Sequence, residues 1–245
     1  MNRIKISPLA TTDQRSDQSQ QRSNSVRSFD KLSIHTNEEF TTFVPLHYEK
    51  NYSYPLIVWL HSDGKDGNEL NEILPHVSVR NFVGIAPKAP VGNFEAGYFW
   101  EQEADTIDFT HDLISSALDS AKNRFNINRH RVFLAGAGAG GTMAYRIGLE
   151  RPELFAGVIS LNGPLPKEER PLMHWNTCRD LPVFWAHSRQ SGDFPQSLLC
   201  EQLRLLHIAG FSVTLRQYPG EKCLHKKTLG DLNRWIMEMF SSTIS

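Results

Sequence analysis

Residues 131–163 read RVFLAGAGAGGTMAYRIGLERPELFAGVISLNG, which joins an apolar run to a glycine cluster and a helical pattern. The apolar residues Val132–Ala135 predict a buried strand that runs directly into GAGAGG. Thr142–Leu149 then predicts a helix, and Gly157–Leu161 predicts a second strand after a short Arg-Pro-Glu turn. Small residues let the chain turn sharply between strand and helix. The segment is therefore typical of an α/β protein.

The rest of the chain repeats this alternation of short apolar runs and helical patterns. Apolar residues recur at helical spacing over Thr106–Phe125 and again from Leu229 to Met239. Most apolar runs are continuous, as expected for parallel strands covered by helices on both faces. We therefore predict an α/β fold with three layers and a mostly parallel central sheet. The predicted strands are Phe40–Val44, Pro55–Leu60, Val83–Ala86, Arg131–Ala135, Gly157–Leu161, Pro182–Ala186 and Val213–Gln217.

The overall composition excludes several classes of function. A formal net charge of -1 over 245 residues provides no positive field for nucleic acid. No apolar run reaches the roughly 18 residues of a membrane helix, and the N-terminus lacks the apolar core of a secretory signal. The 3 cysteines are an odd number without a CxxC pair, so they predict neither a disulfide framework nor a zinc site. We expect a soluble, cytoplasmic protein without a nucleic-acid partner or a membrane span.

The N-terminal segment differs from the remainder of the chain. Residues 1–30 are rich in Ser, Gln and Arg and nearly free of aliphatic residues, so they predict a disordered tail. Residues 31–245 are then expected to form a single domain. Basic residues in the tail could contact an acidic surface, although Asp13, Asp17 and Asp30 dilute their charge.

The glycine cluster resembles the nucleophile elbow of the phospholipase/carboxylesterase branch of the α/β-hydrolases, which includes the acyl-protein thioesterases. The elbow of that family commonly reads G-x-S-x-G-G-x-M-A, and the residues that fit it here are Gly136, Gly140, Gly141, Met143 and Ala144. The resemblance extends from about Phe40 to Phe240 and implies an α/β-hydrolase fold. The position of the nucleophilic serine falls on Gly138, which has no side chain to attack an acyl carbon.

The other two catalytic positions of the family also differ in this chain. After the strand Pro182–Ala186 the family shows H-G-x-x-D-x-x-V-P, whereas this chain reads HSRQSGDFP and has Ser191 at the acid position. Near the C-terminus the family shows Y-x-G-x-x-H-S, and counting back from the following helix puts Lys222 at the histidine position. Asp193 and His225 are the possible substitutes nearby, although a histidine at a helix start is more often a solvated cap.

The resemblance also implies a pocket near the elbow. The sequence HSDGKDG, which begins at His61, resembles the family's oxyanion loop, so the matching backbone donors are those of Asp63 and Ala139. His61 and Gly64 could equally shape a turn. Tyr98 and Trp100 lie in an aromatic segment that could line a cleft for a small apolar or acyl ligand, or could simply pack in the core. The excursion Pro164–Asp180, with Met173, His174 and Trp175, could roof the same cleft.

The glycines also allow a dinucleotide-binding interpretation, because GAGAGG nearly matches G-x-G-x-x-G. That fingerprint belongs in the first βα turn of a Rossmann unit, and here it lies in the middle of the chain. No group of histidines and cysteines suggests a metal site. We therefore expect neither a cofactor nor a metal.

Three functions follow from these patterns. The leading hypothesis is a pseudo-esterase, a catalytically degenerate α/β-hydrolase that binds a small molecule or a protein partner. The second is an active carboxylic-ester hydrolase without a serine, which uses Asp193 with His225 or Lys222 to activate water. The third is an interaction platform that recognises its partner through residues 1–30.

Overall fold

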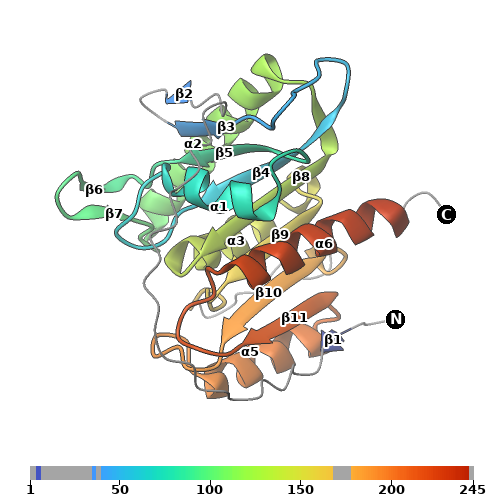
Figure 1. Cartoon of the computed structure of the whole chain (residues 1–245). Coiled ribbons are helices and arrows are strands. Elements are labelled where there is room, and N and C mark those ends of the chain that lie inside the picture. The colour runs from blue at the N-terminus through green and yellow to red at the C-terminus, as the bar shows by residue number, and fades with distance from the viewer. Residues whose placement is uncertain (1–3, 7–34, 37–39, 168–177, 243–245) are drawn as a thin grey trace, which may run out of the picture.

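A computed structural model describes residues 4–6, 35–36, 40–167 and 178–242 of the chain (Figure 1). Within these residues the strands of the central sheet are β1 (Ile4–Ile6), β2 (His35–Thr36), β3 (Phe40–Phe43), β4 (Tyr54–Leu60), β5 (Val83–Pro87), β8 (Ile127–Ala137), β9 (Gly157–Leu161), β10 (Val183–Ser188) and β11 (Val213–Tyr218). Their order across the sheet is β1-β11-β10-β9-β8-β4-β5-β3-β2. The pairs β2·β3 and β3·β5 are antiparallel, and the remaining pairs are parallel. The predicted mostly parallel sheet is confirmed.

Helices cover both faces of this sheet. Figure 1 shows α1 (Glu69–Val77) and α6 (Lys226–Ser242) on the near face. The opposite face is covered by α2 (Ala104–Arg124), α3 (Ala139–Glu150) and α5 (Gln196–Ile208). The predicted three-layer α/β architecture is therefore confirmed.

The alternation of side chains along β4 explains why the strand is apolar throughout. Leu56, Val58 and Leu60 enter the core beneath α2, α3 and α5, whereas Ile57 and Trp59 enter the core beneath α1 and α6. All five side chains are fully buried. A strand covered on both faces has no solvent-facing position, so its sequence shows a continuous apolar run.

All seven predicted strands are present, with ends that differ by a few residues. The helices expected over Thr106–Phe125, over Thr142–Leu149 and near the C-terminus correspond to α2, α3 and α6. The sequence did not predict α1, α5 or the hairpin formed by β6 (Val91–Asn93) and β7 (Gly97–Phe99). The short turn after α3 forms a 3₁₀ helix over Pro152–Leu154.

The structure describes three residues of the predicted tail over residues 1–30, namely Ile4–Ile6. These residues form β1, an edge strand that pairs in parallel with β11 through Ile4↔Val213 and Ile6↔Leu215. The isoleucines have the β-branched shape that favours a strand. The rest of the proposed tail, and the division of the chain at residue 30, stay predictions because residues 7–34 lie outside the described part.

Candidate functional site

The elbow begins where β8 ends and α3 starts, at the carboxyl edge of the sheet. Gly138 has φ 56° and ψ -125°, a strained backbone conformation that residues with a side chain rarely adopt. Its amide donates a hydrogen bond of 3.0 Å to the Leu161 carbonyl, and its carbonyl accepts one of 3.1 Å from the Thr142 amide. The turn is therefore fixed to the neighbouring strand β9 and to the first turn of α3.

Close packing of backbone explains a second glycine in this segment. A Cβ atom on Gly140 would lie 2.3 Å from the Leu60 carbonyl oxygen and 2.5 Å from that of His61. Only glycine lets α3 approach the end of β4 so closely. This contact brings the loop that follows β4 beside the elbow.

The side chain of Asp63 contacts one of the two backbone amides that the sequence predicts as oxyanion donors. Its Oδ2 atom accepts a hydrogen bond of 3.3 Å from the Ala139 amide, which is the donor that the resemblance assigns to an oxyanion. The first amides of a helix attract negative charge, and Gly138 offers no side chain to cap α3. Asp63 therefore serves as a carboxylate cap, so Ala139 does not present a free donor to a ligand.

A buried carboxylate supports the loop that carries Asp63. Glu69 Oε2 accepts hydrogen bonds of 2.9 Å from Trp59 Nε1 and 2.8 Å from the Ser62 amide. Both donors belong to the end of β4 and the residues that follow it. Glu69 thus links the start of α1 to the loop beside the elbow.

His61 has a structural role in the same loop. Its Nε2 atom accepts a hydrogen bond of 3.0 Å from the Ala89 amide, so its Nδ1 atom carries the proton that is donated to the Ser62 carbonyl. Burial lowers the pKa of His61. The ring is therefore neutral, and both of its nitrogens are occupied, as expected for a residue that shapes a turn.

The loop after β10 contains the position predicted for the catalytic acid. The Ser191 hydroxyl accepts a hydrogen bond of 3.2 Å from the Phe194 amide, which shapes the turn. His187 is fully buried and donates from Nε2 to the Phe194 carbonyl at 2.9 Å. Burial lowers the pKa of His187, so it braces the loop as a neutral ring. The exposed Asp193 forms no hydrogen bond or ion pair with any other described residue.

Asn162 joins the two loops that carry the predicted acid and histidine positions. Its Oδ1 atom accepts hydrogen bonds of 2.7 Å from the Ser188 amide and 3.1 Å from Cys223 Sγ. Its Nδ2 atom donates to the Glu221 carbonyl at 3.1 Å. Sequence reasoning missed Asn162, although an Asn directly after a strand can take the positive φ of 57° seen here. The network therefore holds the Glu221 carbonyl and the Cys223 side chain, on either side of Lys222.

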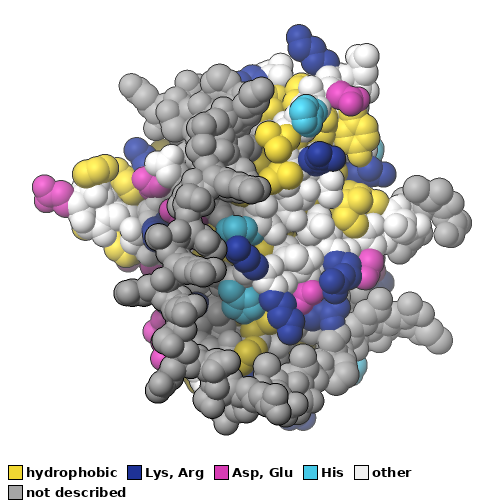
Figure 2. Space-filling model, viewed as in Figure 1, with side chains coloured by type: hydrophobic (Ala, Val, Ile, Leu, Met, Phe, Trp, Pro, Cys, Tyr) yellow, Lys and Arg dark blue, Asp and Glu magenta, His cyan; other side chains and the backbone are white. Residues whose placement is uncertain are grey.

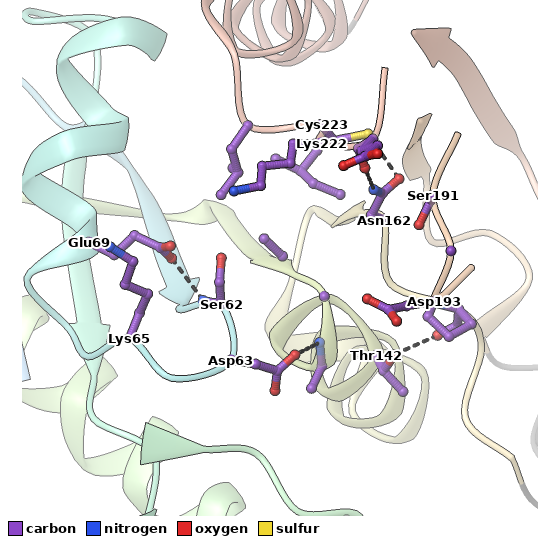
Figure 3. A pocket seen from close by; sticks show the side chains of 18 of the residues that line it. Ser62, Asp63, Lys65, Glu69, Thr142, Asn162, Ser191, Asp193, Lys222 and Cys223 are labelled. Carbon is purple, nitrogen blue, oxygen red and sulfur yellow. Dashed lines mark hydrogen bonds between the residues drawn. The ribbon is translucent and has the colours of Figure 1, made fainter. Parts of the chain in front are cut away.

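A cavity of about 900 Å³ opens above the elbow and brings the predicted site residues together (Figure 3). Its lining includes the three residues that the sequence predicts at catalytic-triad positions, Gly138, Ser191 and Lys222, and also Asp63, Ala139 and Asp193. These residues come from the loops after four strands of the sheet. Ligand sites in open α/β sheets lie at this edge.

Three other predicted residues do not line this cavity. Trp100 is buried and donates from Nε1 to the His61 carbonyl at 3.0 Å, so it packs in the core. Tyr98 belongs to β7, where the Lys88 ammonium lies 4.9 Å from the centre of its ring. His225 directly precedes α6, and its Nδ1 atom accepts a hydrogen bond of 3.3 Å from the Thr228 amide, so it acts as a helix cap.

The segment predicted to cover the cavity is only partly described, and the searches for a metal site and for a membrane helix gave the following results. Pro164 lines the cavity, but Met173, His174 and Trp175 lie outside the described residues. Among the described residues, no group of three or more His, Cys, Asp or Glu side chains is placed to hold a metal ion. Nor is any helix of the described part long and apolar enough to cross a membrane.

The strand order, the helices on both faces and the strained elbow define an α/β-hydrolase fold. A sequence model of the phospholipase/carboxylesterase family matches residues 99–237, more than half of the chain. The protein therefore belongs to the phospholipase/carboxylesterase family. Gly138, Ser191 and Lys222 all lie inside the matched region, whereas the loop that carries Asp63 precedes it.

Solved structures support the same fold at low sequence identity. Esterase PE8 is 20% identical with a TM-score of 0.63, and the match covers 80% of this chain and 96% of that chain. SOBER1 of Arabidopsis thaliana is 19% identical with a TM-score of 0.64, covering 76% and 99% of the two chains. A carboxylesterase from Mesorhizobium loti is 14% identical with a TM-score of 0.65, covering 81% and 94%. A search of curated proteins found no match.

Proposed function

We propose that this protein is a pseudo-esterase, a catalytically degenerate member of its family whose cleft binds a ligand or partner without cleaving an ester. Gly138 supplies no nucleophile, Ser191 cannot balance an imidazolium charge, and Lys222 replaces the general base. All three line one cavity, which supports the interpretation that they are the changed positions of one catalytic group.

The hydrogen bond between Asp63 and Ala139 carries this proposal. Ester cleavage places a developing negative oxygen at the first amides of the helix after the nucleophile. Here that position is held by a carboxylate of the protein itself, with Oδ2 3.3 Å from the amide nitrogen. Loss of one oxyanion donor alone slows catalysis by roughly a hundred- to a thousandfold. An additional negative charge at the same place opposes the intermediate further.

In the alternative function, an ester hydrolase without a serine, Asp193 or Lys222 would activate water, and both residues line the cavity. His225 does not belong to that lining and is used as a helix cap, so a base supplied by histidine is disfavoured. The alternative therefore depends on Lys222 or Asp193 activating water. Both side chains are exposed, so replacing either residue should not disturb the fold.

Hydrolysis of p-nitrophenyl butyrate tests the proposal directly. The purified protein should release p-nitrophenol no faster than a protein-free blank, and Lys222→Ala, Asp193→Asn and His225→Ala should behave identically. Lys226→Ala is the matched control, because Lys226 is exposed and does not line the cavity. Turnover that Lys222→Ala abolishes and Lys226→Ala preserves would establish the hydrolase instead.

We also propose a reducing location such as the cytoplasm, since all three cysteines, Cys178, Cys200 and Cys223, are free thiols. The platform alternative depends on residues 1–30, of which the structure describes only Ile4–Ile6. A deletion that tests it should start after β1, because removing β1 would also remove an edge strand of the sheet.

A further inference from the structure

The charged side chains that line the cavity above the elbow are intermixed. Asp63 and Glu69 already accept hydrogen bonds from donors of the protein itself. The other charged residues of the lining are two carboxylates and two ammonium groups, Asp193, Glu221, Lys65 and Lys222. Lys65 lies two residues from Asp63, and Lys222 directly follows Glu221. An ion of either sign that enters the cavity therefore meets like charges as well as opposite ones.

The outer surface nearby shows the same mixture of charges. Figure 2 shows an acidic side chain among the Lys and Arg side chains that lie over α6 and β11. No extended field of one sign thus surrounds this side of the molecule to steer an ion into the cavity. The ligand class has to be inferred from hydrogen-bonding groups rather than from charge.

One hydroxyl group in the wall of the cavity is buried and has no hydrogen-bond partner among the described residues. It is the Oγ atom of Ser62, a lining residue whose backbone amide donates to the Glu69 carboxylate. Figure 3 shows this hydroxyl pointing into the cavity next to Glu69. A buried hydroxyl without a partner costs free energy, which a ligand recovers by supplying the partner.

The opposite wall offers neutral hydrogen-bonding groups as well. The side-chain amide of Gln190 is exposed at the cavity and has no hydrogen bond to another described residue. The Ser191 hydroxyl accepts a hydrogen bond from the Phe194 amide, so its own hydrogen can be donated to a ligand. Figure 3 shows Ser191 and Ser62 on opposite sides of the cavity. A ligand that reaches both walls must therefore donate and accept at several points.

The space between these walls is open. A Cβ atom added to Gly138 would meet a single neighbour within 4 Å, the Oδ2 atom of Asp63 at 3.1 Å. Among the described residues, no aromatic side chain belongs to the lining, so a flat apolar ligand has no ring to pack against. The volume of about 900 Å³ lies within the usual range of roughly 300–1,000 Å³ for ligand sites.

We propose that the cleft binds a neutral polyol such as a small sugar, with one hydroxyl group beside Ser62 and Glu69 and others at Gln190 and Ser191. This inference rests on the proposed binding function and names its ligand class. A hydroxyl group both donates and accepts hydrogen bonds, so a molecule with several of them matches both walls. A neutral polyol also brings no charge that the mixed carboxylates and ammonium groups would repel.

Titration of the ¹⁵N-labelled protein with glycerol, glucose and trehalose, three neutral polyols of increasing size, tests this inference by NMR. We expect saturable shifts of the amide signals of Ala139 and Gly192, which line the cavity, with affinity rising from glycerol to trehalose. Added NaCl should leave trehalose binding unchanged, because salt screens charges only. Tetraethylene glycol dimethyl ether has acceptor oxygens but no hydroxyl donors, so it should bind at least roughly fivefold more weakly than trehalose.

Variants assign the effect to particular side chains. Ser62→Ala and Gln190→Ala should each weaken trehalose binding by roughly three- to tenfold, which corresponds to the loss of one hydrogen bond. Ser116→Ala and Gln196→Ala make the same chemical changes at exposed positions outside the cavity, and they should leave binding unchanged. The amide spectrum of each variant without ligand shows whether the fold is retained.

The absence of saturable shifts with all three polyols up to their solubility limits would overturn the polyol assignment. Equal binding of the ether, or wild-type affinity in both folded variants Ser62→Ala and Gln190→Ala, would overturn it too. None of these results would restore ester hydrolysis, so the pseudo-esterase proposal would stand. Ester turnover in a protein that binds trehalose as expected would instead overturn the pseudo-esterase proposal alone.

Discussion

The Asp63 carboxylate accepts a hydrogen bond of 3.3 Å from the Ala139 amide and so caps α3 from a different loop. Removing this interaction should measurably lower the stability of the protein. Asp63→Ala should lower the free energy of unfolding by about 0.5–1 kcal/mol, through loss of both the cap and the favourable charge at the helix start. Asp63→Asn keeps an acceptor and should lose less. Urea denaturation measures both, and equal stability of Asp63→Ala and the wild type would show that the cap contributes nothing.

Gly138 should tolerate no side chain without loss of stability. Gly138→Ala should destabilise the fold by about 1–3 kcal/mol, because φ 56° with ψ -125° is strained for any other residue. Gly192→Ala is the control, since a Cβ atom there meets nothing within 4 Å. Combining Gly138→Ala with Asp63→Ala should cost less than the sum of the two changes, because the new Cβ atom lies 3.1 Å from Asp63 Oδ2. If the losses of unfolding free energy of the two single variants add up to the loss of the double variant, the result would contradict this contact.

The buried histidines predict a loss of stability in mild acid. Burial lowers the pKa of His61 and of His187 below the ordinary 6.5, so the folded protein keeps both rings neutral where the unfolded chain takes up protons. Stability should therefore be full at pH 7 and fall below about pH 6.5, by at most about 1.4 kcal/mol per pH unit for each ring.

Urea midpoints at pH 7 and pH 5 measure this dependence. His187→Gln should reduce the difference between the two midpoints, while His76→Gln should not, because His76 is exposed on α1. A wild-type midpoint that does not change between pH 7 and pH 5 would contradict the neutral, buried state of both rings.

The thiols should differ sharply in reactivity. Burial raises the pKa of Cys223 to about 12, so almost none of it is thiolate at pH 8, and Cys178 is also buried with a raised pKa. Cys200 is exposed. Iodoacetamide should modify Cys200 in the folded protein and all three thiols in urea, as mapped by peptide mass spectrometry. Rapid labelling of folded Cys223 would show that the network around Asn162 opens.

The sequence predicted the layers of the fold because buried strands and helices leave periodic apolar signals. Leu56 and Trp59 point to opposite faces of the sheet, yet both are apolar, so β4 was recognisable without knowing its neighbours. β1 and β2 have only three and two residues, too few to show a period. α1 was missed because it is nine residues long and contains Pro75, which is unusual inside a helix.

The site was predictable only where a local motif defines the position. The elbow pattern, the motif after β10 and a count back from the C-terminal helix predicted Gly138, Ser191 and Lys222 as the catalytic positions, and these three residues line one cavity. The pairing of Asp63 with Ala139 joins residues from two separate loops, and no pattern along the chain encodes it. Trp100 was a candidate for the lining of the cleft because it lies near a site motif. It packs in the core instead and is 2% exposed, which is the commoner place for an aromatic residue.

We propose that the chain has lost its whole catalytic group rather than a serine alone. Peptide mass spectrometry of Gly138→Ser after incubation with p-nitrophenyl acetate tests it most directly. We expect no acetyl group on the introduced serine and no p-nitrophenol release above that of the wild type, because no histidine–carboxylate pair activates the hydroxyl and Asp63 accepts the hydrogen bond of the Ala139 amide. An acetyl group that forms on this serine and is then hydrolysed would contradict the loss of the catalytic group, since it would mean that a working base and oxyanion site are still present.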